Sequence, residues 1–320
     1  MTAFAKSSFF YRTKRQGGLL TVIGLMVALA IFGLIVSNRF GTISNATNIL
    51  EQSTALALVS LGQTLVIITG GIDLSVGSMV SLASVLLSGI TNGDSAMMYA
   101  ALAVVLGLGI VVGLINAGTT IWLGVHPLIV TLGMGAVLQG ATLLYTQAPA
   151  GAMPLGFDYL AYGRALGIPI GALITIVLFI GTAWFLRMVP FGRYIFAIGD
   201  DAVGAELMGL PRRAVLFFVY AFCGLTASLA AIFLVARLGV GQPYTGQNFT
   251  LTSITPVVVG GTLLSGGRGS VVATLMGVYL ISLLNNLLNF LDLSTHYQLI
   301  IQGLIVIIAV SVYVENKRKV

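Results

Sequence analysis

The chain consists of long apolar runs separated by short segments rich in Gly, Pro and charged residues. An apolar run of roughly 20 residues has the length of an α-helix that crosses the ~30 Å hydrocarbon core of a bilayer. We predict ten such runs, at residues 18–36, 50–69, 76–90, 98–122, 127–146, 168–188, 214–236, 251–264, 271–290 and 297–314. The pattern therefore predicts an all-α, polytopic membrane protein in which residues 1–320 form a single transmembrane domain.

The composition excludes a soluble protein. Apolar residues make up 58% of the 320-residue chain and charged residues only 8%, whereas a soluble domain carries about 25% charged residues. The first apolar run is longer than the core of a signal peptide, so we expect an uncleaved first span. With a single cysteine, Cys223, the chain forms no intrachain disulfide.

Basic residues predict the orientation of the spans. With the N-terminus in the cytoplasm, the inner segments hold Lys6, Arg12, Lys14, Arg15, Arg187, Arg193, Arg212, Arg213, Arg268, Lys317, Arg318 and Lys319, and the outer segments hold Arg39, Arg164 and Arg237. This distribution obeys the positive-inside rule and explains the net charge of +6 without a nucleic-acid partner. Both termini are therefore predicted to be cytoplasmic, which requires an even number of spans.

One hydrophilic segment, residues 190–213, holds a quarter of all charged side chains: Arg193, Asp200, Asp201, Glu206, Arg212 and Arg213. Asp200 and Asp201 are candidate helix N-caps, and Gly209 and Pro211 are typical of a helix end, so we predict a short helix at about 202–208. Such a helix is unstable alone in water. Its apolar residues Val203, Leu207 and Met208 would pack on a partner or on the protein itself; a plain connector is the alternative.

A glycine pattern occurs twice, as Gly70-Gly71-x-x-Leu74-Ser75 and as Gly260-Gly261-x-x-Leu264-Ser265, each time between two apolar runs. One interpretation is structural: glycines permit a tight reversal, and Asp73 and Ser75 cap the next helix. The other is functional, because paired interruptions in the two halves of a transporter often mark its route, and irregular backbone at membrane depth faces protein or water.

Several amides are predicted to lie inside spans, namely Gln63, Asn116, Gln139, Asn285, Asn286 and Asn289. Asn285 and Asn289 are four residues apart and share one helix face. Amides in lipid need polar partners, so these side chains either bond between helices or line a wet cavity. A route lined by amides would suit a neutral polyol, because an amide donates and accepts hydrogen bonds without carrying a charge.

Several kinds of site are missing from the sequence. Glu51, Asp73, Asp94, Asp158 and Asp292 all fall at predicted span ends or in loops, which argues against a proton- or sodium-coupled carrier. His126 and His296 have no metal-ligand spacing, and no Ser/His/Asp group is recognisable, so we predict no metal site and no catalytic residue. The four lysines lie at the chain ends and none belongs to a phosphate-binding loop, so any ATP would be bound by another chain.

Four sequence blocks together resemble the ribose/monosaccharide-type permeases of bacterial ABC importers. They are GGIDLSVGS at 70–78, FGRYIFAIGDDAVGAELMGL at 191–210, VGGTLLSGGRG at 259–269 and LLNNLLNFL at 283–291. The blocks occur in that family's order and spacing, and the similarity extends over nearly the whole chain.

The resemblance implies a subunit of the bacterial inner membrane that moves a monosaccharide or similar polyol by alternating access. It implies three partners: a second permease subunit, a cytoplasmic ABC ATPase and a periplasmic sugar-binding protein. This chain would bind no cofactor, and ATP would be used by the ATPase.

The resemblance also assigns residues. Residues 190–213 match the coupling loop, which carries over to Gly192, Arg193, Gly199, Glu206 and Gly209, with Asp200 and Asp201 replacing a usual Gly-Asn. Gly70, Gly71, Asp73, Ser75 and Gly77 match a family hallmark and, with Gln63, Asn116 and the three asparagines at 285, 286 and 289, are our candidates for the pathway. A second departure is Thr250-Leu251-Thr252-Ser253-Ile254, where many relatives have Glu-Leu-Asp-Ala-Ile.

Two other functions stay open on the sequence. A self-sufficient channel or facilitator would also lack ion-coupling acids, and it predicts solute flux through this chain alone. A membrane enzyme is the third possibility and predicts turnover by the isolated chain.

Overall fold

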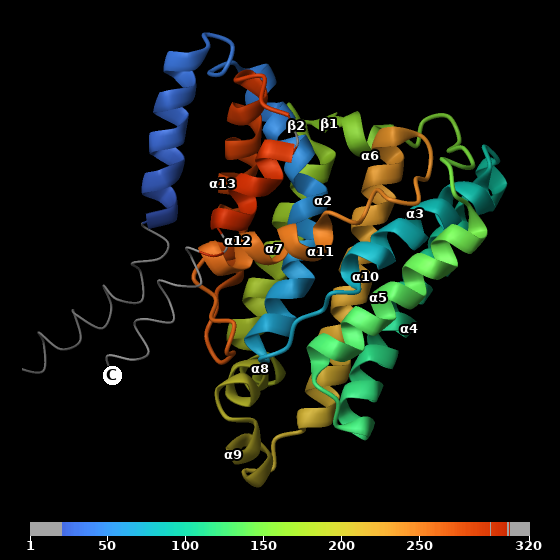
Figure 1. Cartoon of the computed structure of the whole chain (residues 1–320), viewed down its shortest axis with the longest axis vertical. Coiled ribbons are helices and arrows are strands. Elements are labelled where there is room, and N and C mark those ends of the chain that lie inside the picture. Colours follow the sequence, from blue (N-terminus) through green and yellow to red (C-terminus); the bar gives the residue numbers. More distant parts are fainter. Residues whose placement is uncertain (1–20, 295, 306, 308–320) are drawn as a thin grey trace, which may run out of the picture.

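The computed structural model describes residues 21–294, 296–305 and 307, and these form a bundle of α-helices (Figure 1). After an apolar helix at Thr21–Val36 come α2 (Ile43–Ile68), α3 (Val76–Thr91), the 3-10 turn Ser95–Met97, α4 (Met98–Leu123), α5 (Pro127–Tyr145), α6 (Tyr159–Tyr162), α7 (Ile170–Met188), α8 (Pro190–Asp200), α9 (Ala202–Leu207), α10 (Arg212–Leu238), α11 (Phe249–Thr252), α12 (Ile254–Val259) and α13 (Val271–Phe290). Residues 296–305 form a last helix. Between α6 and α7, β1 (Arg164–Ala165) and β2 (Ile168–Pro169) pair as a short antiparallel hairpin, with Arg164 opposite Pro169. The predicted all-α class is confirmed.

Within the described residues, six helices are long and apolar enough to cross a membrane: α2, Ser95–Leu123, α5, α7, α10 and α13. Three shorter apolar helices, at Thr21–Val36, α3 and Phe249–Val259, accompany them. The prediction of a polytopic membrane protein is therefore confirmed. Parts of the first and last predicted spans, and the basic residues at both chain ends, lie outside the described residues.

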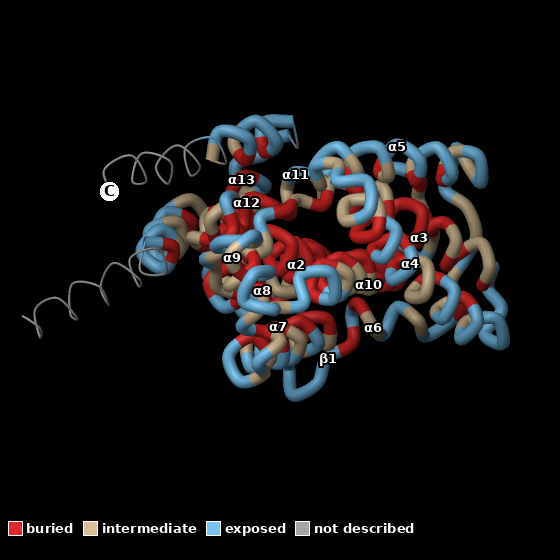
Figure 2. The backbone as a smooth tube through the Cα atoms, turned by 90° about the horizontal axis from the view of Figure 1, so that it is seen from below, coloured by how far each residue is buried: buried red, intermediate tan, exposed pale blue. Residues whose placement is uncertain are grey.

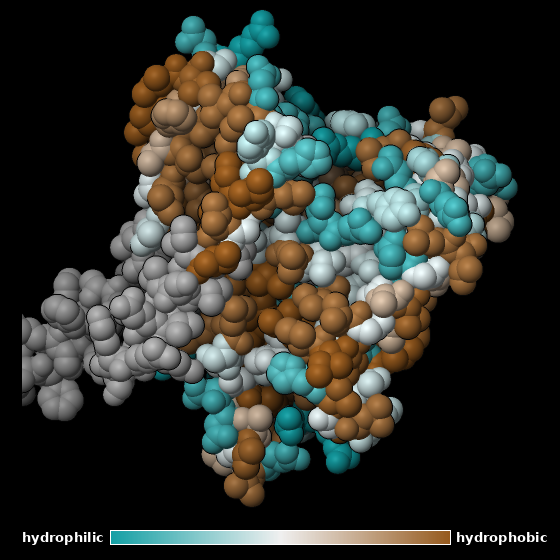
Figure 3. All heavy atoms as spheres, in the orientation of Figure 1, coloured by the Kyte–Doolittle hydropathy of each residue, from teal (hydrophilic) through white to brown (hydrophobic). Residues whose placement is uncertain are grey.

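The helices α2 and α10 form the centre of the bundle (Figure 2). In the most apolar stretch of α2, 89% of the residues are buried. The corresponding share is 22–33% in Ser95–Leu123, α5 and α7, so these helices lie at the periphery of the bundle. Figure 3 shows hydrophobic side chains over much of the visible face, with hydrophilic ones at its upper and lower ends and in a patch across its upper middle. This is the surface expected of a protein whose outer helices contact lipid.

The contact between α4 and α10 is made by small residues. A methyl group on Gly113 would overlap the carbonyl group of Tyr220, and one on Gly224 would overlap the carbonyl oxygen of Gly109. The Ser228 hydroxyl donates a 2.9 Å hydrogen bond to the Val105 carbonyl across the same contact. The two backbones therefore touch directly, as small residues permit in membrane helix pairs.

The eighth predicted span, 251–264, is not one continuous helix. Helices α11 and α12 together cover Phe249–Val259, and 11 residues at 1.5 Å each reach only about 16 Å, roughly half of the hydrocarbon core. Pro256 has no N–H with which to continue α11, and Gly261 follows α12 with φ +87°. In Figure 1 the α11–α12 segment lies across the bundle at mid-height. Residues 239–270 thus connect the top of α10 to the base of α13 as an interrupted crossing.

The hydrophilic segment 190–213 projects from one end of the bundle, which we call the α9 end; the opposite end, with α6, β1 and β2, is the hairpin end (Figure 1). The predicted short helix is confirmed as α9. The longer helix before it, α8, was not predicted. It begins at Pro190, a residue favoured in the first helical turn, and buries Ile195 and Ile198 on one face.

Candidate functional site

Helix α9 is built as a separate capped turn. The Asp201 carboxylate oxygen Oδ1 accepts hydrogen bonds from the backbone N–H groups of Val203 (3.1 Å) and Gly204 (3.0 Å). Asp200 is not the cap; it is the last residue of α8. Gly209 has φ +79° directly after the helix, in agreement with the predicted stop.

The apolar face of α9 points out of the bundle. Val203, Leu207 and Met208 are 69, 84 and 75% exposed, whereas Ala205 packs inward at 1%. Glu206 lies beside this face and forms a 3.5 Å ion pair with Arg212, and Arg193 on α8 is also exposed. No described residue buries the three apolar side chains, so the face is available to another molecule.

The C-terminal end of α8 meets the end of α2 and the segment before α13 in a contact that we call the glycine junction. It consists of Ile68, Gly70, Gly199, Gly266 and Gly267. The Gly267 N–H donates a 2.9 Å hydrogen bond to the Ile68 carbonyl at the end of α2. A methyl group on Gly199 would overlap that carbonyl oxygen and lie 2.6 Å from Gly267 N; one on Gly266 would lie 2.6 Å from the Gly199 oxygen and 2.8 Å from Gly70 N.

The junction joins three of the four sequence blocks, at 70–78, 191–210 and 259–269. The sequence showed each block but not that they touch. Gly192 has a related role, because a methyl group there would lie 2.7 Å from Leu186 Cα, so α8 turns tightly against the end of α7.

Asp73, Ser75 and Asn116 form a buried polar cluster. Asp73 Oδ1 accepts hydrogen bonds from the Ser75 N–H (2.9 Å) and hydroxyl (2.6 Å), and Asn116 Nδ2 donates to Ser75 Oγ at 3.0 Å and to Asp73 Oδ2 at 3.4 Å. All three side chains are at most 2% exposed. The Tyr220 hydroxyl, which is packed against Gly71, has no hydrogen-bond partner among the described residues.

Asp73 lies in the loop between α2 and α3, as predicted, but this loop is largely buried and not at the surface of the bundle. Its partner Asn116 lies well within α4, so the carboxylate is inside the bundle. Residues 69–75 run back inward after α2 before α3 starts at Val76, which places Asp73 there. The ion pairs of the described residues, Arg164–Glu51 and Arg212–Glu206, are both elsewhere. No group of three His, Cys, Asp or Glu side chains in the described part of the chain is placed to hold a metal.

Other predicted pathway residues lie in separate contacts. Gln63 is buried between α2 and α10, with its Oε1 3.9 Å from Cys223 Sγ. Gly77 packs α3 against the loop after α10, because a methyl group there would lie 2.7 Å from the Gly246 carbonyl oxygen. These residues do not converge with the three asparagines of α13.

The three asparagines of α13 have different surroundings. Asn286 is buried and exchanges two hydrogen bonds with Asn45 of α2, at 3.0 and 2.9 Å, as expected for an amide that joins two helices. Asn285 Oδ1 accepts from Gln302 Nε2 at 2.8 Å, and Asn289 Oδ1 accepts from Gln298 Nε2 at 2.7 Å. Asn286 is therefore structural, and the other two face the last helix.

Asn285 also lines a pocket of about 210 Å³ between α2, α11, α13 and the last helix. Its polar lining is Gln52, Asn248, Thr252, Ser282, Asn285, Gln298 and Gln302, and its apolar lining is Leu56, Phe249, Ile281 and Leu299. Four of these lining residues were not predicted from the sequence: Gln52, Asn248, Gln298 and Gln302. The spacing of Gln298 and Gln302, four residues apart on one helix face, was the available signal.

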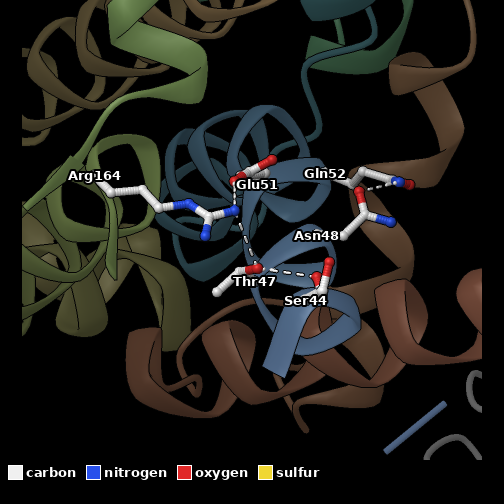
Figure 4. A network of polar contacts seen from close by, with 6 residues as sticks. All are labelled: Ser44, Thr47, Asn48, Glu51, Gln52 and Arg164. Carbon is white, nitrogen blue, oxygen red and sulfur yellow. Dashed lines mark hydrogen bonds and ion pairs between the residues drawn. The ribbon is translucent and has the colours of Figure 1, made fainter. Parts of the chain in front are cut away.

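The rim of this pocket on α2 belongs to a polar network (Figure 4). On one side of α2, Arg164 Nη2 lies 3.5 Å from Glu51 Oε1 and 3.4 Å from Thr47 Oγ1, tying the hairpin to the helix. On the other side, Gln52 Nε2 donates a 2.8 Å hydrogen bond to Asn48 Oδ1. The hairpin end of α2 is thus tied to the hairpin on one side and carries a hydrogen-bonded carboxamide pair of its own on the other.

The comparisons with known proteins agree that the chain is similar to permease components of transport systems. Residues 45–310 match the family described as "Branched-chain amino acid transport system / permease component". The chain is 37% identical over 308 residues to the ribose import permease of Escherichia coli K12, covering 93% of this chain and 94% of that protein. It is 39% identical over 302 residues to the ribose import permease of Bacillus subtilis 168, covering 92% of each chain.

Permeases whose names give other sugars are also similar. The D-allose transport system permease of Escherichia coli K12 is 32% identical over 90% of this chain and 88% of its own length. The fructose import permease of Rhizobium meliloti is 33% identical over 91% of this chain and 83% of its own length. No solved structure matches the chain.

Proposed function

Because the chain belongs to this family of transport-system permease components, we propose that it carries a monosaccharide such as ribose, allose or fructose through the inner membrane. It is the multi-pass permease subunit of an ABC sugar importer and not itself an enzyme. The family binds no cofactor, and a partner ATPase hydrolyses the ATP.

The orientation that we propose places the α9 end in the cytoplasm. Among the described basic residues, Arg187, Arg193, Arg212, Arg213 and Arg268 belong to segments at the α9 end, whereas Arg39, Arg164 and Arg237 lie toward the hairpin end. Positive charge collects on the cytoplasmic side. With α11–α12 and its flanking residues as one interrupted crossing, the chain passes the membrane ten times as one domain, and both termini are cytoplasmic.

In this proposal α9 is the contact for the ATPase. The observation that carries it is the exposed apolar face of Val203, Leu207 and Met208 on a capped helix that projects from the bundle. Movement of the ATPase would displace α8 and α9. The glycine junction would pass that displacement to the end of α2 and to the segment before α13, because backbone touches backbone there and cannot yield as flexible side chains do. A second permease subunit and a periplasmic binding protein complete the importer.

Reconstitution tests this function. The permease is inserted into liposomes with or without the ATPase of its importer, and uptake of radiolabelled D-ribose, D-allose and D-fructose is followed in the presence of the binding protein and ATP. We expect uptake only when ATPase and ATP are both present. Flux through the permease alone would instead establish a facilitator.

Two variants locate the coupling contact. Glu206→Arg reverses one exposed charge, and its ion pair with Arg212 is worth at most about 1 kcal/mol of stability. A second variant lacks residues 202–208. Both should insert into the membrane normally and lose uptake; wild-type uptake at wild-type protein level would refute the coupling role of α9.

A further inference from the structure

The pocket between α2, α11, α13 and the last helix has the chemistry of a neutral, hydroxyl-rich ligand. Five of its lining side chains are carboxamides, contributed by four separate elements, and the described lining includes no charged residue. Each carboxamide offers both donors and acceptors, as does each sugar hydroxyl. Phe249, Leu56 and Ile281 add apolar surface for the carbon-bound face of a ring.

The carboxamides are held in place by a repeated arrangement. Three glutamines each donate their Nε2 to a neighbouring asparagine oxygen: Gln52 to Asn48 at 2.8 Å, Gln298 to Asn289 at 2.7 Å, and Gln302 to Asn285 at 2.8 Å. Each pair fixes the glutamine side chain by one hydrogen bond, so the side chain is oriented before a ligand arrives.

One acceptor in the lining has no partner. Gln302 Oε1 is buried and accepts no hydrogen bond within the described part of the chain. A buried carbonyl oxygen without a donor costs free energy, which a ligand hydroxyl or a water would recover. The pocket volume of about 210 Å³ has room for about seven water molecules at ~30 Å³ each, which is enough for a small polyol.

We infer that this pocket is a binding station for the transported monosaccharide inside the permease, and that its five lining carboxamides contact the sugar hydroxyls. The inference rests on the proposed function and deepens it, because it assigns sugar recognition to named residues of this chain. The pocket lies toward the hairpin end, which is the outer side in the proposed orientation, so a sugar released from the binding protein would meet it first.

Protection of an introduced thiol tests the station. The native cysteine, Cys223, is fully buried and gives little background with a polar thiol reagent. Asn248→Cys places a thiol on the exposed rim of the pocket, and Gln247→Cys places one at the next residue, which is also exposed but does not line it. Both variants are made in the complete importer in proteoliposomes, and the modification rate is measured with D-ribose, D-allose, D-fructose or no sugar.

We expect at least one of the three sugars to slow modification of the Asn248→Cys thiol and to leave the Gln247→Cys thiol unaffected. With sugar at twice a dissociation constant in the millimolar range, the rate falls by 1 + [L]/Kd, or about threefold. Adding Gln302→Leu to the Asn248→Cys variant should remove this protection.

Two outcomes overturn the inference: no sugar slows modification at 248, or every sugar slows both thiols equally. ATP-driven uptake measured on the same vesicles separates the two proposals. Uptake without protection would refute the station and leave the proposed function intact, whereas absence of uptake of any sugar would refute the proposed function itself.

Discussion

Replacing Gly199 by alanine tests whether the glycine junction couples α8 and α9 to the membrane helices. The added methyl group would overlap the Ile68 carbonyl oxygen and lie 2.6 Å from Gly267 N. Those two atoms are joined by the 2.9 Å hydrogen bond that closes the junction. Because all neighbours are backbone atoms, no side chain can rotate away, and the three segments must separate.

The free-energy cost of Gly199→Ala to the closed junction follows from three contributions. Overpacking of a close contact costs about 1–3 kcal/mol, and the lost hydrogen bond costs about 1 kcal/mol. Alanine is better than glycine within helix α8 by up to about 1 kcal/mol. The net destabilisation of the closed junction is therefore about 1–3 kcal/mol. At 1.36 kcal/mol per factor of ten, the closed arrangement becomes about 5- to 150-fold less populated.

The assay compares ATP hydrolysis with sugar uptake in proteoliposomes that contain the complete importer. We expect Gly199→Ala to lower the amount of sugar transported per ATP by about the same factor, since the ATPase still binds the unchanged face of α9. Gly181→Ala in α7 is the matched control, because a methyl group there has no neighbour within 4 Å. That variant should transport normally. Unchanged coupling in Gly199→Ala, with membrane insertion and thermal unfolding like the wild type, would refute the role of the junction.

Three further substitutions have defined outcomes. Asp201→Ala removes the cap of α9 and should lower the stability of that helix by about 1 kcal/mol. Hydrogen exchange would detect this as about fivefold faster exchange of the Val203 and Gly204 amides. Unchanged exchange would show that the cap does not stabilise α9. Asn286→Leu leaves the buried Asn45 Oδ1 without its donor, although Asn45 Nδ2 still donates to the Phe40 carbonyl, and should lower stability by about 1–3 kcal/mol in thermal unfolding. Adding Asn45→Leu should restore part of the loss, and additive losses would contradict the pairing. Ser75→Ala removes the hydroxyl that donates to the Asp73 carboxylate and should also cost about 1–3 kcal/mol, so an unchanged unfolding temperature would exclude this contact.

The sequence predicted those features that depend on local pattern. Apolar runs located the long helices, and Asp201 with Gly209 bounded α9, because span length and helix capping are encoded within a few neighbouring residues. The interruption of the eighth span could also have been predicted, because Pro256 lies inside the apolar run.

Contacts between distant segments could not be predicted from one sequence. The glycine-rich blocks at 70–78 and 259–269 were visible, but their meeting with Gly199 depends on how α2, α8 and the segment before α13 pack. Asp73 was placed at a span end because nothing local shows that residues 69–75 turn back into the bundle. The pocket glutamines were missed because Gln52 and Gln298 lie near span ends, where polar residues are ordinary.

The direct backbone contact of α4 with α10 has a consequence for how a passage opens. With Gly109 against Gly224 and Gly113 against Tyr220, neither helix has room to slide or roll by one residue without a collision. We therefore expect this pair to move as a single unit when the other helices rearrange. The displacement that admits a solute must therefore come from other helix contacts of the bundle, with α4 and α10 carried along together.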